Sequence, residues 1–158
     1  MFDIKYMKKA LVLAKKAAKT GEVPVGAVIV HNGIIISQGY NKREIKQNAL
    51  MHAEIIAIDK ACKKLGSWRL CECELYVTLE PCPMCTGAII NSRIERIYFG
   101  AFDPKAGALG SVCNLSEMAF NHHFSVEGGI MANECGLVLS EFFRNIRERR
   151  NVISEKNE

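Results

Sequence analysis

Two short motifs constrain the fold of this chain more than any other feature: a His-Ala-Glu triplet that begins at His52, and a Pro-Cys-Pro-Met-Cys segment that ends at Cys85. Histidine and cysteine are zinc ligands in proteins, and three such ligands leave the fourth tetrahedral position free for water. If His52, Cys82 and Cys85 bind one ion, two segments that are distant in the sequence must meet in space. Glu54 would then lie beside the ion without binding it.

Each motif lies where a helix is predicted to begin. Pro83 suits the first turn of a helix, because its missing N–H would have no partner there. A spacing of three residues places Cys82 and Cys85 on one face, and the positive end of the helix dipole favours thiolates over thiols. We predict that His52 is the non-helical cap of its own helix, because on an ideal helix Glu54 would point away from it.

The donor set predicts a hydrolytic site. Two thiolates and a neutral imidazole balance the charge of Zn²⁺ and leave its Lewis acidity available to a water molecule. Such an ion lowers the pKa of a bound water to about 7, and we expect Glu54 to take the proton. A carboxylate that moves protons in both directions works best when its own pKa lies near neutrality.

A structural zinc site with four cysteine ligands is the alternative. It would use Cys71 and Cys73 with the two cysteines of the second motif, and it would leave His52 and Glu54 without a role. We interpret Cys71 and Cys73 instead as small apolar residues at the start of a strand. The remaining cysteines are assigned to packing: Cys62, Cys113 and Cys135.

The apolar periodicity predicts helices that alternate with strands. Asn32-Gly33 indicates a tight hairpin, because both residues tolerate positive φ, and the run Ile34-Ile35-Ile36 suits a sheet buried on both faces. A hairpin followed by strand–helix–strand alternation implies an α/β fold, a mixed sheet with helices on both faces. The predicted helices span residues 4–19, 52–65, 83 onward and 133–150, the predicted strands 25–31, 34–40, 74–79, 94–99 and 124–127, and the main loops 41–51 and 101–125.

The size and composition are those of one globular domain. The chain has 158 residues, too few for two ordinary domains; we place the domain at 1–153 and expect 154–158 to fray. No apolar run approaches the ~20 residues of a membrane span, and the first residues do not resemble a secretory signal. An odd number of cysteines, seven, argues for a reducing compartment, so we expect a cytoplasmic protein without a membrane partner.

Positive charge is concentrated towards the two ends of the chain. The net charge of +4 is below that of a DNA-packaging domain. Residues 1–20 nevertheless carry six lysines against one aspartate, and residues 141–150 carry four arginines against two glutamates. This pattern fits either a polyanionic partner or the solvated faces of two terminal helices.

The two motifs together resemble the His-x-Glu and Pro-Cys-x-x-Cys pattern of zinc-dependent nucleobase deaminases. Over about residues 5–145 the chain resembles the bacterial tRNA-specific adenosine deaminases of the cytidine deaminase-like superfamily, which convert the wobble adenosine of a tRNA anticodon to inosine. The stretches that carry this narrower resemblance are Glu22–Val28, Gly39–Asn41, Tyr76–Cys85, Phe99–Ala101 with Asp103 and Gly107, and Glu141–Arg144.

The resemblance implies a three-layer α/β/α sandwich with a five-stranded mixed sheet. It implies one Zn²⁺ per subunit, bound by His52, Cys82 and Cys85, with Glu54 as the proton shuttle. The partners would be the anticodon stem-loop of a tRNA and a second copy of the chain, in a homodimer whose two subunits both touch the RNA.

Substrate contacts also follow from the resemblance. Asn41 would hydrogen-bond the flipped base, the backbone N–H groups of Ala53 and Cys82 would lie near it, and Asp103 would lie among the contacts to flanking nucleotides. An asparagine amide both donates and accepts at a purine edge, although Asn41 and Asp103 are also common turn residues. The resemblance also suggests RNA contacts for Asn121 and His122, in a segment that departs somewhat from the family pattern. The residues themselves suggest that Phe142, Phe143 and Arg144 supply stacking and charge to RNA, or that the phenylalanines dock the last helix on the sheet. We expect one phenylalanine to pack this helix and the other to contact RNA.

Two other functions compete with this interpretation. A deaminase of a free base or nucleoside, such as guanine or cytosine, would use the same metal site but would have no need of basic termini. A non-catalytic zinc-dependent RNA-binding module would have no use for Glu54, a free carboxylate beside an open zinc position.

Overall fold

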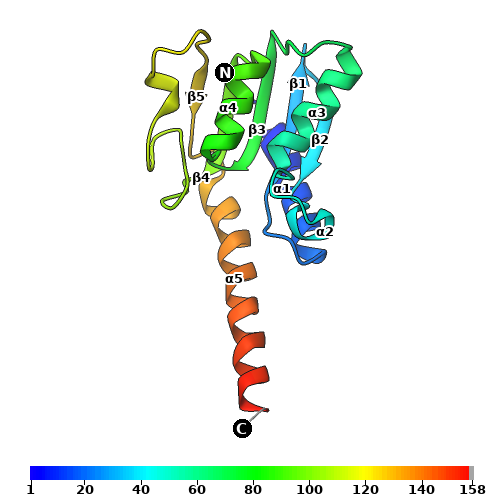
Figure 1. The fold of residues 1–158 in the computed structure, drawn as a ribbon, viewed down its shortest axis with the longest axis vertical. Coiled ribbons are helices and arrows are strands. Elements are labelled where there is room, and N and C mark those ends of the chain that lie inside the picture. Colours follow the sequence, from blue (N-terminus) through cyan, green and yellow to red (C-terminus); the bar gives the residue numbers. More distant parts are fainter. Residues whose placement is uncertain (157–158) are drawn as a thin grey trace.

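The sheet has five strands: β1 (Gly26–His31), β2 (Ile34–Tyr40), β3 (Cys73–Leu79), β4 (Arg96–Ala101) and β5 (Ser125–Glu127). In the computed structural model, which describes residues 1–156, they follow the order β2-β1-β3-β4-β5 (Figure 1). β1 pairs antiparallel with β2 and β3, whereas β3, β4 and β5 run parallel. The predicted mixed sheet is confirmed.

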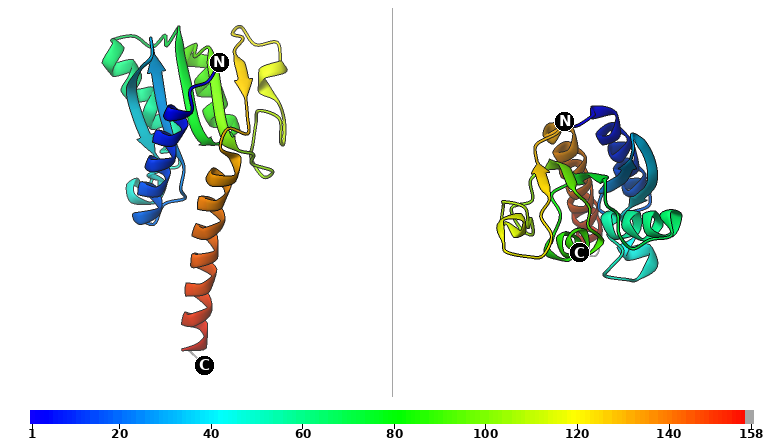
Figure 2. Two further views of the ribbon diagram at one scale, coloured as in Figure 1. Left: turned by 180° about the vertical axis from the view of Figure 1, so that it is seen from behind. Right: turned by 90° about the horizontal axis from the view of Figure 1, so that it is seen from above.

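Helices cover both faces of this sheet, so the predicted three-layer sandwich is confirmed as well (Figure 2). The helices are α1 (Ile4–Lys19), α2 (Arg43–Lys46), α3 (Ala53–Leu65), α4 (Pro83–Ser92) and α5 (Ala132–Glu155). α3 and α4 pack on one face, and α1 with the first part of α5 packs on the other.

Alternate residues of the central strands fill the two cores. Along β3, Leu75 and Val77 pack with α3 and α4, while Tyr76 between them packs with α1. All three side chains are fully buried, and burial of a side chain of this size contributes about 1.5–3 kcal/mol. β3 is therefore held from both sides, which gives the segment that follows it a rigid starting point.

The hairpin between β1 and β2 forms as the sequence predicts. Asn32 and Gly33 both have positive φ, 49° and 74°, as a two-residue turn of this kind requires. The expectation that both strands are buried on both faces holds for β1 only. β2 is an edge strand with one neighbour, and Ile34 is 66% exposed; an apolar run alone does not tell an edge strand from a central one.

Several element boundaries differ from the predicted ones. β4 begins at Arg96 and continues to Ala101, because Ile94 still belongs to the turn that follows α4, where its N–H bonds the Ile89 carbonyl. The polar segment 41–51 contains the short helix α2. α5 extends through Glu155, so Ser154 and Glu155 are helical where fraying was expected, and residues 157–158 of that tail lie outside the described residues.

α5 projects far beyond the rest of the molecule (Figure 1). Its first turns pack on β3, β4 and α1, and every residue from 147 to 156 is exposed. No helix among residues 1–156 is long and apolar enough to cross a bilayer.

Candidate metal centre and active site

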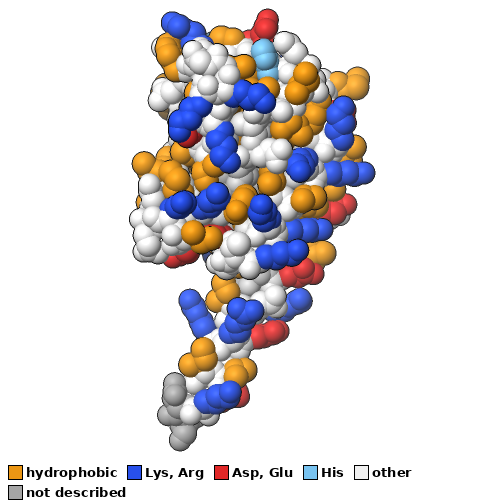
Figure 3. Space-filling model, turned by 90° about the vertical axis from the view of Figure 1, so that its right-hand side faces the viewer, with side chains coloured by type: hydrophobic (Ala, Val, Ile, Leu, Met, Phe, Trp, Pro, Cys, Tyr) orange, Lys and Arg blue, Asp and Glu red, His pale blue; other side chains and the backbone are white. Residues whose placement is uncertain are grey.

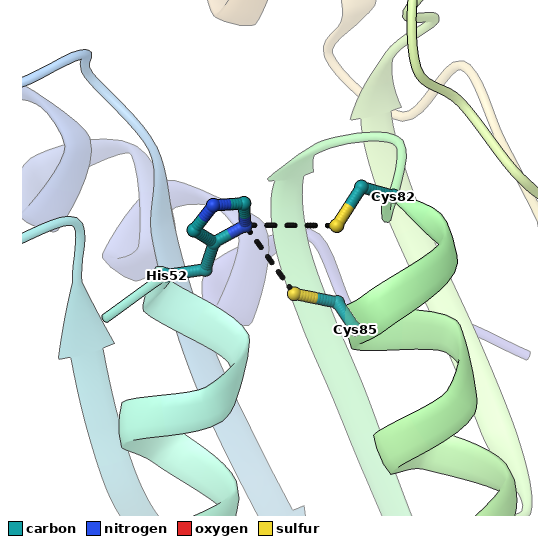
Figure 4. A group of neighbouring side chains, drawn as sticks. All are labelled: His52, Cys82 and Cys85. Carbon is teal, nitrogen blue, oxygen red and sulfur yellow. Dashed lines mark hydrogen bonds between the residues drawn. The ribbon is translucent and has the colours of Figure 1, made fainter. Parts of the chain in front are cut away.

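Three side chains from the two sequence motifs meet at one point between α3 and α4. His52 Nδ1 lies 3.6 Å from Cys82 Sγ and 3.5 Å from Cys85 Sγ (Figure 4). His52 is the N-cap of α3, with extended backbone at φ −74° and ψ 155°, and Cys82 is the N-cap of α4. The predicted cap position of His52 is confirmed, and two helix N-termini converge on the cluster.

The geometry of the three donor atoms fits a tetrahedral metal ion. An ion with bonds of about 2.0–2.1 Å to nitrogen and 2.3 Å to sulfur places those donor atoms about 3.5 Å apart. The two observed separations, 3.6 Å and 3.5 Å, match this value. All three donor atoms lie within 4.8 Å of one another, so one ion can reach them together.

The electrostatics of the cysteines also favour a cation. A hydrogen bond from Cys85 lowers the pKa of Cys82 to about 4, with a further contribution from His52 and against the effect of burial. The neighbouring Cys82 and burial raise the pKa of Cys85. The pair by itself therefore carries one negative charge, and a positive ion beside the sulfurs is needed for both to ionise.

Glu54 lies in the first turn of α3 and is almost completely buried, at 4% exposure. Burial raises its pKa to about 7, opposed in part by a backbone hydrogen bond and by His52. A carboxyl group with a pKa near neutrality can both accept and donate a proton under physiological conditions. Glu54 thus has the property that the sequence analysis requires of a proton shuttle.

The four-cysteine alternative does not match the structure. Cys73 begins β3, whereas Cys82 follows the other end of that strand, so the two pairs lie at opposite ends of the sheet. Among the described residues, the cluster able to hold a metal ion contains His52 and lacks Cys71 and Cys73. Cys73 and Cys135 are buried as predicted for packing residues, but Cys71 and Cys113 are exposed, because both lie in loops.

A pocket of about 200 Å³ opens beside the cluster. It lies at the carboxyl ends of β2, β3 and β4, and ligands of open α/β sheets commonly bind outside the carboxyl ends of the strands. Of the residues predicted from the sequence, six line it: Asn41, His52, Ala53, Glu54, Cys82 and Asp103. The other lining residues are Val23, Val25, Arg43, Leu79, Glu80 and Ala106.

Asn41 and Asp103 both shape loops at the pocket. Asn41 donates from Nδ2 to the Val23 carbonyl at 3.3 Å and accepts at Oδ1 from the Arg43 N–H at 3.0 Å. An amide oxygen has two lone pairs and an amide nitrogen two hydrogens, so Asn41 retains one acceptor and one donor for a ligand. Asp103 accepts at Oδ1 from two backbone N–H groups that follow it in its turn.

Sequence reasoning missed two buried acids that hold the loops of the pocket. Glu22 is fully buried and accepts the N–H groups of Glu44 and Ile45 at the start of α2. Glu80 is 2% exposed and accepts from the segment 103–111. The available signal was an acidic residue next to apolar residues, a position where a charge is costly without partners.

The remaining predicted residues lie away from this pocket. His122 donates from Nε2 to the Ile94 carbonyl at 2.7 Å and stacks on Phe124, beyond the end of α4 that is opposite to the cluster. Asn121 is exposed beside it. On α5, Phe142 is half-buried in a groove against the end of α1, and Phe143 and Arg144 are exposed. Their predicted contacts with RNA stay predictions.

The fold and the site together identify the chain as a cytidine deaminase-like protein. The five-stranded mixed sheet is that of this fold, and the His-Cys-Cys cluster, which is able to hold a metal ion, lies beside a buried carboxylate.

Known proteins narrow this class. Residues 1–147 match the MafB19-like deaminase family. The tRNA-specific adenosine deaminase of Bacillus subtilis (strain 168) is 54% identical over 149 residues, which cover 94% of this chain and 92% of the relative. A solved structure from work on tRNA:A34 deaminases and A-to-I editing at the wobble position of transfer RNA is 42% identical, with a TM-score of 0.83, over 87% of this chain and 100% of that one. A guanine deaminase from Bacillus subtilis is 32% identical, with a TM-score of 0.61, over 77% and 88% of the two chains.

The chain belongs to the MafB19-like deaminase family and, within it, to the tRNA-specific adenosine deaminases.

Proposed function

We propose that this protein is a zinc-dependent hydrolytic deaminase that converts the wobble adenosine of a tRNA anticodon to inosine with release of ammonia. The observation that carries the proposal is Glu54, a buried carboxylate that lies next to a three-donor cluster and lines the same pocket. A structural metal site has no use for such a group, whereas a hydrolytic site requires one.

The residues of the pocket divide the chemistry among them. A zinc ion bound by His52, Cys82 and Cys85 would supply an acidified water as the nucleophile. Glu54 takes one proton from this water and passes it to the ring nitrogen of the adenine, as the oxygen bonds to the carbon that bears the amine. Glu54 then takes the second proton from the same oxygen and passes it to the amine, so that the carbon–nitrogen bond breaks and ammonia leaves. Both transfers are possible because its pKa is raised to about 7 and lies near the working pH.

The pocket suits one flipped base. Its volume of about 200 Å³ is below the roughly 300–1,000 Å³ of pockets for larger ligands, so the sugar and phosphates of a nucleotide would remain outside. Asn41 offers one donor and one acceptor to the edge of the base, and Ala53 lies beside it in the same pocket. An enzyme that acts on a base within an RNA loop must extrude it in this way.

The surface of the molecule supports an RNA substrate. Lysine and arginine side chains are spread over one face and continue along α5 (Figure 3). Arg144 and its arginine neighbours on α5 are exposed, and among the described residues they have no ion-pair partner. Phe143 is 42% exposed and is the better placed of the two phenylalanines to contact RNA, as base stacking on aromatic side chains requires.

A homodimer with one Zn²⁺ per subunit, acting on tRNA in the cytoplasm, completes the proposal. The resemblance to tRNA-specific adenosine deaminases motivates the dimer. The proposed substrate and the absence of disulfides among the seven cysteines support a cytoplasmic location. Asn121 and His122 are retained as candidate RNA contacts outside the pocket.

Deamination of a free base is the second candidate, because a guanine deaminase shares the fold at 32% identity. One assay separates the two. Purified protein with its zinc content measured is incubated in parallel with total tRNA, free adenosine, guanine and cytosine, and inosine and ammonia are quantified, with Glu54→Ala as the inactive control. We expect inosine in tRNA and little ammonia from the free compounds. Ammonia from guanine without inosine in tRNA would contradict the proposal.

A further inference from the structure

Glu80 is the residue immediately after β3, and its carboxylate collects hydrogen bonds from one distant loop. Oε1 accepts the N–H of Asp103 at 3.2 Å. Oε2 accepts the N–H groups of Leu109 and Ser111, each at 3.1 Å. The hydroxyl of Ser111 donates to Oε1 as well. One buried side chain therefore binds both the beginning and the end of the segment 103–111.

This segment contains no helix or strand. Its own hydrogen bonds are local turns, such as that from the Gly107 N–H to the Asp103 carbonyl at 2.9 Å, together with an isolated bridge between Leu109 and Asn114. The middle of the loop rests directly on the carboxylate, since a Cβ on Gly107 would lie 2.2 Å from Glu80 Oε2. The Ala108 N–H adds one bond to the Pro81 carbonyl, at 2.9 Å. Glu80 is thus the main group that determines where this loop lies.

The same loop forms one side of the pocket beside the metal cluster, since Asp103 and Ala106 line it. We infer that Glu80 is a positioning residue: its carboxylate fixes the segment 103–111 as one wall of the substrate pocket. This inference rests on the proposed function for the identity of the substrate, but not for the role of Glu80 in the loop.

A carboxylate suits this task better than any neutral side chain. When ionised it only accepts hydrogen bonds and offers about four lone-pair sites, which matches the four donors that surround Glu80. Glutamine has the same shape, but its NH₂ group would face backbone N–H groups and repel them. β3 is held in place because both its faces are buried. The carboxylate follows β3 directly, so its hydrogen bonds hold the segment 103–111 in a fixed position relative to the sheet.

The test compares Glu80→Gln with Glu74→Gln in the full-length, zinc-loaded protein. Glu74 is a matched control at the other end of β3, where its carboxylate pairs with Arg96 at 2.8 Å, far from the pocket. Hydrogen–deuterium exchange of peptides covering 103–111, zinc content, and kcat and KM on a tRNA anticodon stem-loop are measured for each variant.

We expect faster exchange in 103–111 for Glu80→Gln and unchanged zinc content. kcat/KM should fall by about 100-fold, as for other misplaced binding groups, and mainly through KM, because the wall contacts the base before and during reaction. Glu74→Gln should change neither the exchange of 103–111 nor kcat/KM. Ser111→Ala, which removes one donor, should give a smaller loss of about 10-fold.

Unchanged exchange in 103–111, or faster exchange with unaltered KM, overturns the inference. If Glu80→Gln does not fold, Ser111→Ala decides by the same two measurements. A failure of the proposed function looks different: the unmodified protein would then leave the stem-loop unreacted, while the exchange of Glu80→Gln would still report on the loop.

Discussion

Glu54 and Glu80 have the same type of side chain, but their different surroundings give them different roles. Both are glutamates with less than 5% exposure at the same pocket. Glu80 is surrounded by four donors, which hold it as an anchor for backbone. Glu54 lies beside His52 and the two thiols, and burial dominates its environment and raises its pKa to about 7. Glu54, the glutamate with the shifted pKa, is therefore the one that lies at the metal cluster.

Replacing Glu54 with alanine should abolish turnover and leave the metal in place. General acid–base groups contribute about 10²–10⁴-fold to rates, and the three donors of the cluster do not include Glu54. Single-turnover kinetics on tRNA and zinc per chain by mass spectrometry check this. Loss of zinc in the variant would show that Glu54 is a ligand.

The seven thiols should react in an order set by exposure and pKa. Cys71 and Cys113 are exposed. Burial raises the pKa of Cys73 and of Cys135 to about 11, so few of these thiols are ionised at pH 8, and only thiolates alkylate readily.

Iodoacetamide at pH 8 should therefore label Cys71 and Cys113 first in the native protein, as read by peptide mass spectrometry. A chelator should add Cys82 to the labelled set, because a bound metal blocks its sulfur, whereas Cys85 is buried and its pKa is raised. Labelling of Cys135 at the rate of Cys71 would contradict the packing.

Among the helices and strands, close approach of α3 to β2 sets the position of the metal cluster. Gly39 lies under the first turn of α3, where a Cβ would meet the Ala53 carbonyl oxygen at 2.4 Å. His52 and Glu54 flank this contact in the sequence. The helix that carries the histidine ligand can therefore approach the sheet only because residue 39 has no side chain.

Gly39→Ala should lower the free energy of unfolding by about 1–3 kcal/mol, the usual cost of overpacking, and should weaken zinc binding by shifting His52. The matched control is Gly87→Ala on α4, where a Cβ meets no atom within 4 Å; it should stabilise the helix by about 0.5–1 kcal/mol. Urea unfolding and zinc competition titrations measure both. Equal zinc affinity in the two variants would contradict this role of Gly39.

The whole molecule combines a compact sandwich with a long basic arm. From residue 147 to residue 156 every residue is exposed, and this part of the chain projects away from the sandwich. Two explanations fit the arginine-rich sequence of this part of α5: its charges are solvated by water, or they contact a polyanion. The proposed tRNA substrate is larger than the pocket and would need such a surface, because phosphate contacts supply most of the affinity for nucleic acids.

The double change of Arg144 and Arg147 to glutamate should weaken tRNA binding and reduce its salt dependence. Loss of two phosphate contacts lowers the slope of log K against log salt by roughly 1.5. Lys63 and Lys64 changed to glutamate give a control of equal charge at the far end of α3. Filter binding at several salt concentrations measures both; equal affinity of the two variants would assign the α5 arginines to solvation alone.

The sequence by itself determined the donors of the cluster, the helix starts that carry them, the hairpin and the mixed sheet. Each of these follows from local rules: cap and turn residues, ligand spacing and apolar periodicity act within a few residues of one another. Hence His52 could be placed at a cap, and Asn32-Gly33 in a turn, before any tertiary contact was known.

Only the tertiary structure decided the walls of the pocket and the exposure of β2. Glu22 bonds residues 22 and 23 positions away, and Glu80 bonds residues 23 to 31 positions away. No local pattern specifies such partners, because a carboxylate accepts any N–H that the fold brings to it. The separation of His122 from the pocket has the same origin, since strand order and connection lengths, not residue type, determine which loops share an end of the sheet.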